Sequence, residues 1–360
     1  MARVEDVARL ARVSPITVSR VVNKHPNVSR GTRERVLRAI AELNYIPNAA
    51  ARGLKQARSD LLALIITDIN SPFYTAAARG AEDAARAAGL SLILGNSDED
   101  PAVEAEYLRV MGERRVDGVI LSPTDQAGEA IARNLPVGLP IVLFDRAAPG
   151  VEADLVTCDT QTGARVLCRH LLHIGHRRIA IVGGLPSVAT WPARVAGYEA
   201  ALREAGQPLT PELVIAGDYK SPGGVAAVRH LLARDDLPDA IIAANAQVAI
   251  GVLEELAARG IRVPEDVGVA AIDDPLPNLS FLLRFTVVEQ PGYQMGKAAV
   301  EILVARLRGT RTDAQPWRLV FDAQLRPGQS CGEGRVAGAD GTLHAQDSSE
   351  EQHVEGAATR

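Results

Sequence analysis

Residues 4–54 read VEDVARLARVSPITVSRVVNKHPNVSRGTRERVLRAIAELNYIPNAAARGL, and this stretch decides the architecture of the amino-terminal part of the chain. Apolar residues recur close to helical spacing over residues 4–11, and acidic residues occupy the first turn, where the helix dipole favours negative charge. Ser14 then stands as an N-cap, and Pro15 takes the first helical position, where its missing N–H costs nothing. The pattern predicts two short helices joined by a tight turn, the arrangement called helix-turn-helix.

A third helix is expected to begin at Ser29. Val36, Ile40 and Leu43 recur at intervals of three or four residues and can close a small apolar core. We therefore expect residues 1–46 to form an all-α domain. The second helix of such a domain enters the major groove of DNA with its N-terminal residues toward the base edges.

Charge is unevenly distributed along the chain. Residues 1–60 contain 12 Lys and Arg against 5 Asp and Glu, whereas the remaining residues contain 27 against 39. A basic head provides the electrostatic attraction that phosphate binding requires, and an acidic body is kept from sticking to the same polyanion. The charge distribution therefore points to double-stranded DNA as a partner.

After residue 60 the pattern changes to apolar runs separated by alanine-rich helical stretches such as residues 76–88. The runs read LLALIITD, LSLILGNS, DGVILSP, PIVLFD, RIAIVGG, DAIIAAN and VGVAAID. Continuous apolar strands between helices predict doubly wound α/β architecture, with a parallel sheet covered on both faces. Because roughly 270 residues is large for one such domain, we expect residues 61–330 to form two lobes, with a ligand cleft at the carboxyl ends of the strands.

The strings VSPITVSRVVN, VSRGTRERV and ELNYIPNAAARGL have the order and spacing found in the lactose-repressor (LacI) family of bacterial transcription regulators, which the chain resembles. The body resembles the family's periplasmic-binding-protein-like core from DINSPFY through NSDEDP, RRVDGVI, FDR, GHRRIAIVGG and RVAGYEAAL to VGVAAIDD and EQP. The resemblance implies a transcriptional repressor that binds a pseudo-palindromic operator as a homodimer and responds to a small effector.

In the family, residues near the cap of the second helix face the bases, which places Pro15, Ile16 and Arg20 at the reading edge. Arg20 could bind guanine O6 and N7 in bidentate fashion, whereas Ile16 can make only apolar contact, for instance with a thymine methyl. Polar side chains around them are expected to position the head on the backbone. The remaining residues expected at the DNA here are Ser14, Thr17, Ser19, Asn23, Asn27 and Ser29.

Residues 47–60 are expected to be a linker that becomes helical only on DNA, because it is too short to be a stable helix alone. In the family this segment is a hinge helix, paired across the dimer in the minor groove. Leu54 stands at the position of the family's apolar wedge, which kinks the DNA, with Asn48 at the start and Ala51 on the packing face. The alternative is that Leu54 packs against the body.

Carried over by position, the resemblance places an effector site at the strand ends of both lobes. The expected effector-binding residues are Ser71, Phe73, Tyr74, Asp145, Arg146, Arg194, Tyr219, Asn245, Asp273 and Gln290. Carboxylates and amides bind vicinal hydroxyls, Arg supplies a planar fork and an aromatic ring covers an apolar sugar face, so the site suits a sugar or a sugar derivative. The plainer alternatives are Asp145 as a turn cap, Arg194 as a surface ion-pair partner, and Phe73 or Tyr74 as ordinary core.

Three positions depart from the family's pattern. Arg12 replaces the usual Gly of the turn, so either the turn is strained or its geometry differs, and its side chain is equally well a phosphate contact or a solvated residue. Ala246 replaces an Asp that commonly follows Asn245. Thr160 ends the string VTCDT where the family has a VVDN-like string.

Motifs for catalysis or metal binding are scarce. Neither GxGxxG nor GxxxxGK[ST] occurs, and His170, His173 and His176 lack a converging set of further ligands, which favours a solvated helix face. We therefore expect no enzyme activity, no metal and no cofactor. A solute-binding module would leave the basic head unexplained, and a sugar-acting α/β enzyme would need a nucleophile or acid–base pair that we do not find.

Cys158, Cys168 and Cys331 show no paired spacing, so reduced thiols are expected. The start of the chain lacks an apolar signal core, and no apolar run is long enough to span a bilayer, which predicts a cytoplasmic, nucleoid-associated protein without membrane contact. Residues 331–360, rich in Gly, Ala, Ser and acids, are expected to be a disordered acidic tail.

Overall fold

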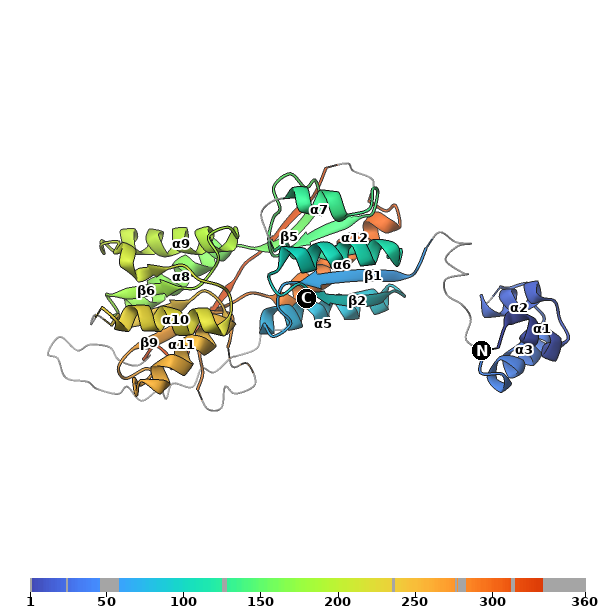
Figure 1. Cartoon of the computed structure of the whole chain (residues 1–360), viewed down its shortest axis with the longest axis horizontal. Coiled ribbons are helices and arrows are strands. Elements are labelled where there is room, and N and C mark those ends of the chain that lie inside the picture. The colour runs from blue at the N-terminus through green and yellow to red at the C-terminus, as the bar shows by residue number, and fades with distance from the viewer. Residues whose placement is uncertain are drawn as a thin grey trace, which may run out of the picture. The chain divides into compact units, whose positions relative to one another are not determined.

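The chain forms two compact units, Met1–Ser59 and Asp60–Arg360, which we call the head and the body. Figure 1 shows the structure, a computed structural model of the whole chain. The residues that it describes are 2–23, 25–45, 58–124, 128–234, 237–275, 277, 283–311 and 315–332.

The head contains three helices, as predicted: α1 (Val4–Ala11), α2 (Pro15–Val22) and α3 (Arg30–Glu42). Each of the last two begins at a serine cap, because the side chain of Ser14 accepts a hydrogen bond from the amide of residue 17, and that of Ser29 accepts one from the amide of residue 32. The apolar faces of the helices meet in one small core. Its buried members are Val7, Ala8, Ala11, Val18, Val21, Val36 and Ala39.

The turn between α1 and α2 is strained at Arg12. This residue is the C-cap of α1 and lies in the left-handed region, with φ 54° and ψ 52°. A β-carbon makes that conformation costly, whereas glycine adopts it freely. The helix-turn-helix geometry is thus retained without the usual glycine, at the expense of local strain.

Arg12→Gly is therefore expected to raise the free energy of unfolding of the head by about 1 kcal/mol. The Arg12 side chain is exposed, so its removal takes nothing from the apolar core. Urea unfolding of the full chain, followed by helical circular dichroism, measures the change. A head that is less stable after the substitution would show that the arginine side chain contributes more than the strain costs.

The body consists of two lobes, each built on a six-stranded sheet with helices on both faces (Figure 1). The first sheet has the order β11-β5-β4-β3-β1-β2, and the second has the order β12-β10-β9-β8-β6-β7. The strands of lobe 1 are β1 (Leu61–Ile66), β2 (Ser91–Asn96), β3 (Gly118–Leu121), β4 (Ile141–Phe144), β5 (Asp154–Cys158) and β11 (Arg318–Phe321). Those of lobe 2 are β6 (Ile179–Val182), β7 (Val214–Ile215), β8 (Ala240–Ala243), β9 (Gly268–Ile272), β10 (Thr286–Glu289) and β12 (Gln324–Arg326).

Helices complete both lobes. Lobe 1 contains α5 (Pro72–Ala87), α6 (Pro101–Glu113), α7 (Gly128–Asn134) and α12 (Gly292–Leu307). Lobe 2 contains α8 (Thr160–His173), α9 (Thr190–Glu204), the 3-10 turn η1 (Pro211–Leu213), α10 (Ser221–Leu232) and α11 (Ala246–Ala258). Helix α5 begins four residues before the expected residue 76, because Pro72 is well suited to the first turn of a helix.

All seven apolar runs singled out in the sequence are parallel strands, but further strands join them. Three of these, β5, β10 and β11, carry polar residues or lie near a sheet edge, which hides them from a search for continuous apolar runs. The edge strand β12 pairs antiparallel with β10, so the second sheet is not wholly parallel. The chain passes between the lobes after β5, β10 and β11, so the ends of these strands lie where the two lobes meet.

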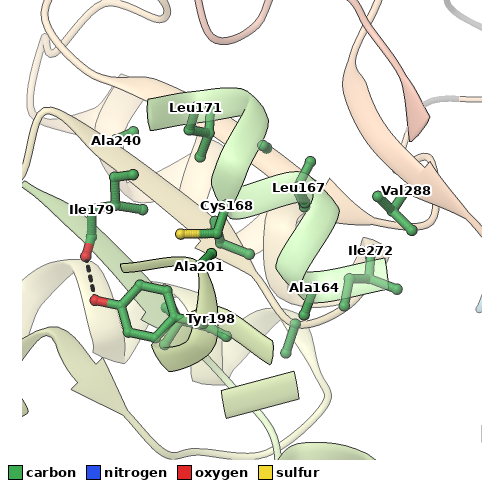
Figure 2. Packing of buried hydrophobic residues seen from close by; sticks show 14 of the residues in the cluster. Ala164, Leu167, Cys168, Leu171, Ile179, Tyr198, Ala201, Ala240, Ile272 and Val288 are labelled. Atoms are coloured by element: carbon green, nitrogen blue, oxygen red, sulfur yellow. Dashed lines mark hydrogen bonds between the residues drawn. The ribbon is translucent and has the colours of Figure 1, made fainter. Parts of the chain in front are cut away.

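On one face of the lobe 2 sheet, buried apolar side chains form a cluster that Figure 2 shows from close by. Helix α8 buries Leu167, Cys168 and Leu171 against α9 and the sheet, and the hydroxyl of Tyr198 donates to the carbonyl of Ile179 at 2.8 Å (Figure 2). This hydrogen bond satisfies the polar end of a side chain that is otherwise fully buried.

Cys331, which the sequence assigns to the start of the tail, is instead buried in the core of lobe 2. Its carbonyl contacts the Nε2 atom of His176 at 2.9 Å, so the solvated face expected for the three histidines is wrong for His176. Cys158, Cys168 and Cys331 are all free thiols, as expected. Residues 333–360 of the expected tail lie outside the described residues.

Candidate DNA interface and effector cleft

The outer face of α2 presents the residues expected to read bases. Ile16 is 66% exposed, although it is a large apolar residue, and Pro15 and Arg20 are exposed beside it. The inner face of the same helix is buried through Val18 and Val21. The side chains at the reading edge are therefore not needed for the core of the head, which leaves them available to DNA.

The polar residues expected at the phosphates surround this face. Ser14 and Ser29 cap helices, and the Ser14 and Thr17 hydroxyls lie 3.0 Å apart. Asn23 donates to the Ser19 hydroxyl at 3.4 Å. Thr17 is half-buried. The other members of the set are exposed: Ser14, Ser19, Asn23, Asn27 and Ser29. The expected hinge residues Asn48, Ala51 and Leu54 lie outside the described residues.

In lobe 1 the cleft is centred on Asp145 and Arg146, which follow β4. The hydroxyl of Tyr74 donates to Asp145 Oδ2 at 3.0 Å and lies 2.9 Å from the hydroxyl of Ser122. Burial raises the pKa of Tyr74, so its proton remains available to Asp145. Arg146 makes a bidentate pair with Glu99, at 2.8 and 2.7 Å. Asp145 is therefore a buried carboxylate whose position is fixed by its neighbours.

In lobe 2 the expected site includes Arg194, which belongs to α9 and is only 4% exposed. Its Nε donates to the hydroxyl of Thr160 at 2.8 Å, and its Nη1 donates to the carbonyl of Ala244 at 2.7 Å. The guanidinium carbon lies 5.8 Å from the centre of the Tyr219 ring. This rules out the surface ion-pair alternative, and it gives the unusual Thr160 a specific partner.

Tyr219 joins the two lobes. The Arg146 guanidinium of lobe 1 lies 5.2 Å from its ring centre, on the scale of a cation–π contact. The Tyr219 hydroxyl lies 2.7 Å from the hydroxyl of Thr190. Asn245 donates to the Tyr219 carbonyl at 2.9 Å and also caps α11, so both ends of the Asn245 amide are engaged within lobe 2. Asn245 thus positions the aromatic ring.

Asp273 and Gln290 form a second carboxylate site at the ends of β9 and β10. Asp273 accepts hydrogen bonds from the Gln290 backbone amide at 2.9 Å and from its side-chain nitrogen at 2.8 Å. Burial raises the pKa of Asp273 to about 6, against the opposing effect of those hydrogen bonds. The Gln290 Oε1 atom is buried without a hydrogen-bond partner among the described residues. It is therefore a free acceptor next to the carboxylate.

The two aromatic residues of the first loop have different roles. Phe73 is buried in the core of lobe 1 and stacks on Phe144 with 5.8 Å between ring centres, as the ordinary-core alternative has it. Tyr74 is equally buried, but its hydroxyl reaches the Asp145 carboxylate. Ser71 is the N-cap residue of α5 without a side-chain capping bond.

Four acidic residues around the cleft have left-handed backbones: Asp98, Glu99, Asp145 and Asp273, with φ of 56°, 61°, 65° and 64°. Such conformations are costly for residues with a β-carbon, and they persist where the surroundings hold them. The amide of Asp145 donates to the carbonyl of Val156, and the amide of Asp273 donates to that of Val288, so matching positions of the two lobes are held by neighbouring strands. Two of the four, Asp145 and Asp273, are carboxylates of the expected site.

Two cavities adjoin these residues. One of about 390 Å³ is lined by Asp145, Arg146, Thr160 and Thr190 among others, and one of about 320 Å³ is lined by Phe73, Asp273 and Gln290 among others. Their volumes lie in the range of small-molecule sites. Two larger hollows, of about 580 and 810 Å³, follow α12 and include none of the expected effector residues.

The sequence does not indicate three contacts of the cleft: those of Glu99, of Thr160 as the acceptor for Arg194, and of Thr190. Glu99 lies within the string NSDEDP, which carries only the family resemblance. Nothing in the spacing indicates that it pairs with a residue 47 positions away. Thr190 gave no signal, because an isolated hydroxyl at the start of a helix is common.

The raised pKa of Asp273 makes a testable contribution to stability. The folded body binds this proton more tightly than the unfolded chain, so the residue's contribution to the free energy of unfolding falls as pH rises from about 4 to about 6. Between pH 5 and pH 7.5, the free energy of unfolding of the wild-type body should fall by about 1 kcal/mol relative to that of Asp273→Asn. Urea unfolding at both pH values measures the difference. Parallel pH dependence in the two proteins would contradict the assignment.

Neither a metal site nor a membrane span was found in the part of the chain that the structure describes. No group of three or more His, Cys, Asp or Glu side chains there could hold a metal ion. Within the same residues, no helix combines the length and the apolar character needed to cross a bilayer.

Comparison with known proteins agrees with this organisation. The family model described as "Bacterial regulatory proteins, lacI family" matches residues 3–48, and that described as "Periplasmic binding proteins and sugar binding domain of LacI family" matches residues 59–316. The HTH-type transcriptional repressor PurR of Aliivibrio salmonicida (strain LFI1238) is 32% identical over 309 residues, which cover 86% of this chain and 93% of the relative.

Solved structures show the same similarity. The transcriptional regulator CelR–cellobiose complex matches with a TM-score of 0.67 and 34% identity over 92% of this chain and 100% of that one. The lac repressor dimer bound to operator and the anti-inducer ONPF matches with a TM-score of 0.78 and 26% identity, over 92% of this chain and 99% of that one. Matches of this extent cover both the head and the body, and the chain therefore belongs to the LacI family of bacterial regulatory proteins.

Proposed function

We propose that this DNA-binding regulator is a repressor that binds a pseudo-palindromic operator as a homodimer and is controlled by a sugar or a sugar derivative. The observation that carries the proposal is the combination of an exposed reading edge on α2 with a cleft that holds carboxylates, guanidinium groups and an aromatic ring. A similar structure with cellobiose supports the effector class, and one of a dimer on its operator supports the assembly.

The effector is proposed to bind between the lobes. Asp145 and Asp273 accept hydrogen bonds from hydroxyl groups, and the free acceptor of Gln290 adds to them. Arg194 donates from the other lobe, and the Tyr219 ring covers an apolar face of the sugar. Ser71, Phe73, Tyr74, Arg146 and Asn245 complete the site as lining or positioning residues.

Control of DNA binding is proposed to pass through the linker. Residues 1–46 would form the DNA-binding domain, residues 47–60 the hinge with Leu54 as its wedge, residues 61–330 the effector-binding and dimerisation domain, and residues 331–360 the tail. An effector can shift the protein between two states only through its differential affinity for them. The two states are proposed to differ in the geometry of the lobes and therefore in the spacing of the two hinges of the dimer, and the effector is proposed to prefer one of them.

The protein is proposed to work in the cytoplasm on the nucleoid, without catalytic activity. Operator binding requires access to chromosomal DNA, and the proteins that are similar to this chain are named as transcriptional regulators. The acceptor-rich cleft needs neither a metal nor a cofactor to bind hydroxyl groups.

Arg20→Ala tests the reading edge. A bidentate contact to one guanine discriminates against the wrong base by about 1 to 3 kcal/mol, so the variant should lose preference at one operator position. Fluorescence anisotropy on operators that vary at each position measures this, with Arg38→Ala, an exposed residue of α3, as control. Equal weakening on every sequence would instead make Arg20 a phosphate contact.

A further inference from the structure

We propose that Asp98 and Glu99 form a relay between Arg146 in the cleft and an ion pair that holds the two lobes together. Glu99 and Lys220 are then positioning residues of the effector site, although neither was expected there. The functional meaning of the relay rests on the proposed effector site, but its physical test needs neither effector nor DNA.

The first half of the relay is a buried ion pair within lobe 1. The Arg146 and Glu99 side chains are 6% and 9% exposed. Arg146 Nη1 donates to Glu99 Oε2 at 2.8 Å, and Nη2 donates to Oε1 at 2.7 Å. Bidentate pairs of this kind fix orientation as well as distance. Glu99 therefore holds the Arg146 guanidinium, together with the Pro123 carbonyl at 3.2 Å, at a position 5.2 Å from the centre of the Tyr219 ring in lobe 2.

The second half is the ion pair between Asp98 and Lys220, with 2.9 Å between Oδ1 and Nζ. Lys220 belongs to lobe 2 and directly follows Tyr219, whose carbonyl is bound by Asn245. The amide of Lys220 donates to Asp218 at 2.9 Å. Lobe 2 thus presents two consecutive residues to lobe 1, Tyr219 to Arg146 and Lys220 to Asp98.

Backbone strain links the two halves. Asp98 and Glu99 are neighbours in the left-handed region, with φ of 56° and 61°. The loop is anchored on both sides, since Ser97 donates to the Ile66 carbonyl and Asp100 caps α6. Between these anchors, the Asp100 amide donates to the Ser97 carbonyl at 2.9 Å across residues 98 and 99, and the side-chain ion pairs of these two residues add to what opposes relaxation of the strain. If Glu99 releases Arg146, the loop relaxes and withdraws Asp98 from Lys220.

The contacts form a ring, which runs from Arg146 through Glu99, Asp98, Lys220 and Tyr219 back to Arg146, and this ring has a functional consequence. A ligand that separates Arg146 from Glu99 loosens this edge of the cleft, whereas a ligand that leaves the pair intact keeps the lobes closed. The relay thereby converts contact with one cleft residue into a change at the lobe boundary, which is the differential contact that effector control requires.

Distances between the lobes of the ligand-free full chain test the relay. Spin labels at Val137→Cys in lobe 1 and Leu209→Cys in lobe 2 occupy exposed positions, whereas the three native thiols are buried. Lys220→Met should raise the ratio of open to closed chains about two- to fivefold, as expected for a partly exposed ion pair. Glu99→Gln should have a similar effect, although Glu99 does not touch lobe 2 in the relay.

The double variant separates a relay from two independent contacts. Once Lys220 is replaced, Glu99→Gln should open the lobes less than it does alone, because only the contact between Arg146 and Tyr219 is left for it to disturb. Gln247→Ala removes a different contact between the lobes, from Gln247 Nε2 to the Asn70 carbonyl at 2.8 Å, and should add to Glu99→Gln. Lys297→Met breaks an exposed pair with Glu301 inside α12 and should leave the distances unchanged.

An unchanged distance distribution for Glu99→Gln, or full additivity with Lys220→Met, would overturn the relay. If circular dichroism shows that Glu99→Gln does not fold, Glu99→Asp replaces it. That variant keeps the charge but shortens the reach, so it should shift the distances in the same direction by a smaller amount. Failure of operator binding in any variant would bear on the proposed function alone, because the distances are measured without DNA.

Discussion

Replacing Arg194 by alanine is expected to abolish the response to the effector while the affinity for the operator is retained. The side chain is 4% exposed, donates to Thr160 and to the Ala244 carbonyl, and faces Tyr219. Its loss removes the main cationic donor of lobe 2 and leaves two buried acceptors unpaired. No part of this network belongs to the head.

The measurement is an effector titration of a labelled operator complex. A thermal-shift screen of sugars, sugar phosphates and nucleosides first identifies the ligand, because binding to the folded state raises its melting temperature. Wild type should release or gain operator as ligand is added, and Arg194→Ala should show no change at any ligand concentration. Arg203→Ala, at an exposed position of the same helix, serves as control.

Loss of stability must be separated from loss of contact. Two unpaired buried acceptors cost about 1 to 3 kcal/mol each, so Arg194→Ala should also lower the melting temperature of the body. Arg194→Met restores apolar volume but no donor, and it should remain unresponsive while recovering part of the stability. An ordinary titration curve in either variant would remove Arg194 from the effector site.

Gly296→Ala is expected to destabilise the body by about 3 kcal/mol, the upper range for overpacking. A β-carbon at Gly296 would lie 2.0 Å from the Ala77 carbonyl oxygen of α5, and one at Gly80 would lie 2.0 Å from the Tyr293 carbonyl oxygen of α12. Helices α5 and α12 therefore approach backbone to backbone, and a methyl group forces them apart.

The sign of this effect is the test, because alanine is otherwise the better helix residue by about 1 kcal/mol. Urea unfolding should show a lower midpoint for the body transition. Gly31→Ala, in α3 of the head, meets nothing within 4 Å and should stabilise the head instead. An unchanged body transition in Gly296→Ala would show that the helices can separate without loss. Since Tyr74 lies on α5, the variant should also weaken effector binding.

Much of the head followed from local chemistry. Serine caps, an N1 proline and apolar spacing act over a few residues, so the boundaries of α1 and α2 could be predicted from residues 4–22. The left-handed Arg12 was foreseen as one of two outcomes, because a turn of fixed geometry must either change or strain a residue with a β-carbon. The exposure of Ile16 agrees with the reading edge that the family resemblance implies.

The members of the cleft were predictable only in part, and their arrangement was not. Family resemblance brought Tyr74, Asp145, Arg194 and Tyr219 to one place in advance, and the structure adds how each is held. Phe73 proved to be a core residue, since its ring meets Phe144.

The sequence by itself determined a basic three-helix reader followed by alternating apolar strands and helices, because capping, periodicity and charge are properties of neighbouring residues. Only the tertiary structure decided that Glu99 fixes Arg146, that Thr160 receives Arg194, and that Cys331 is core. Glu99 and Arg146 are 47 residues apart, Thr160 and Arg194 are 34 apart, and Cys331 is 155 residues from its partner His176. Their contacts depend on how strands from distant segments line up in a sheet. Burial and hydrogen-bond geometry arise from that alignment, which no local pattern encodes.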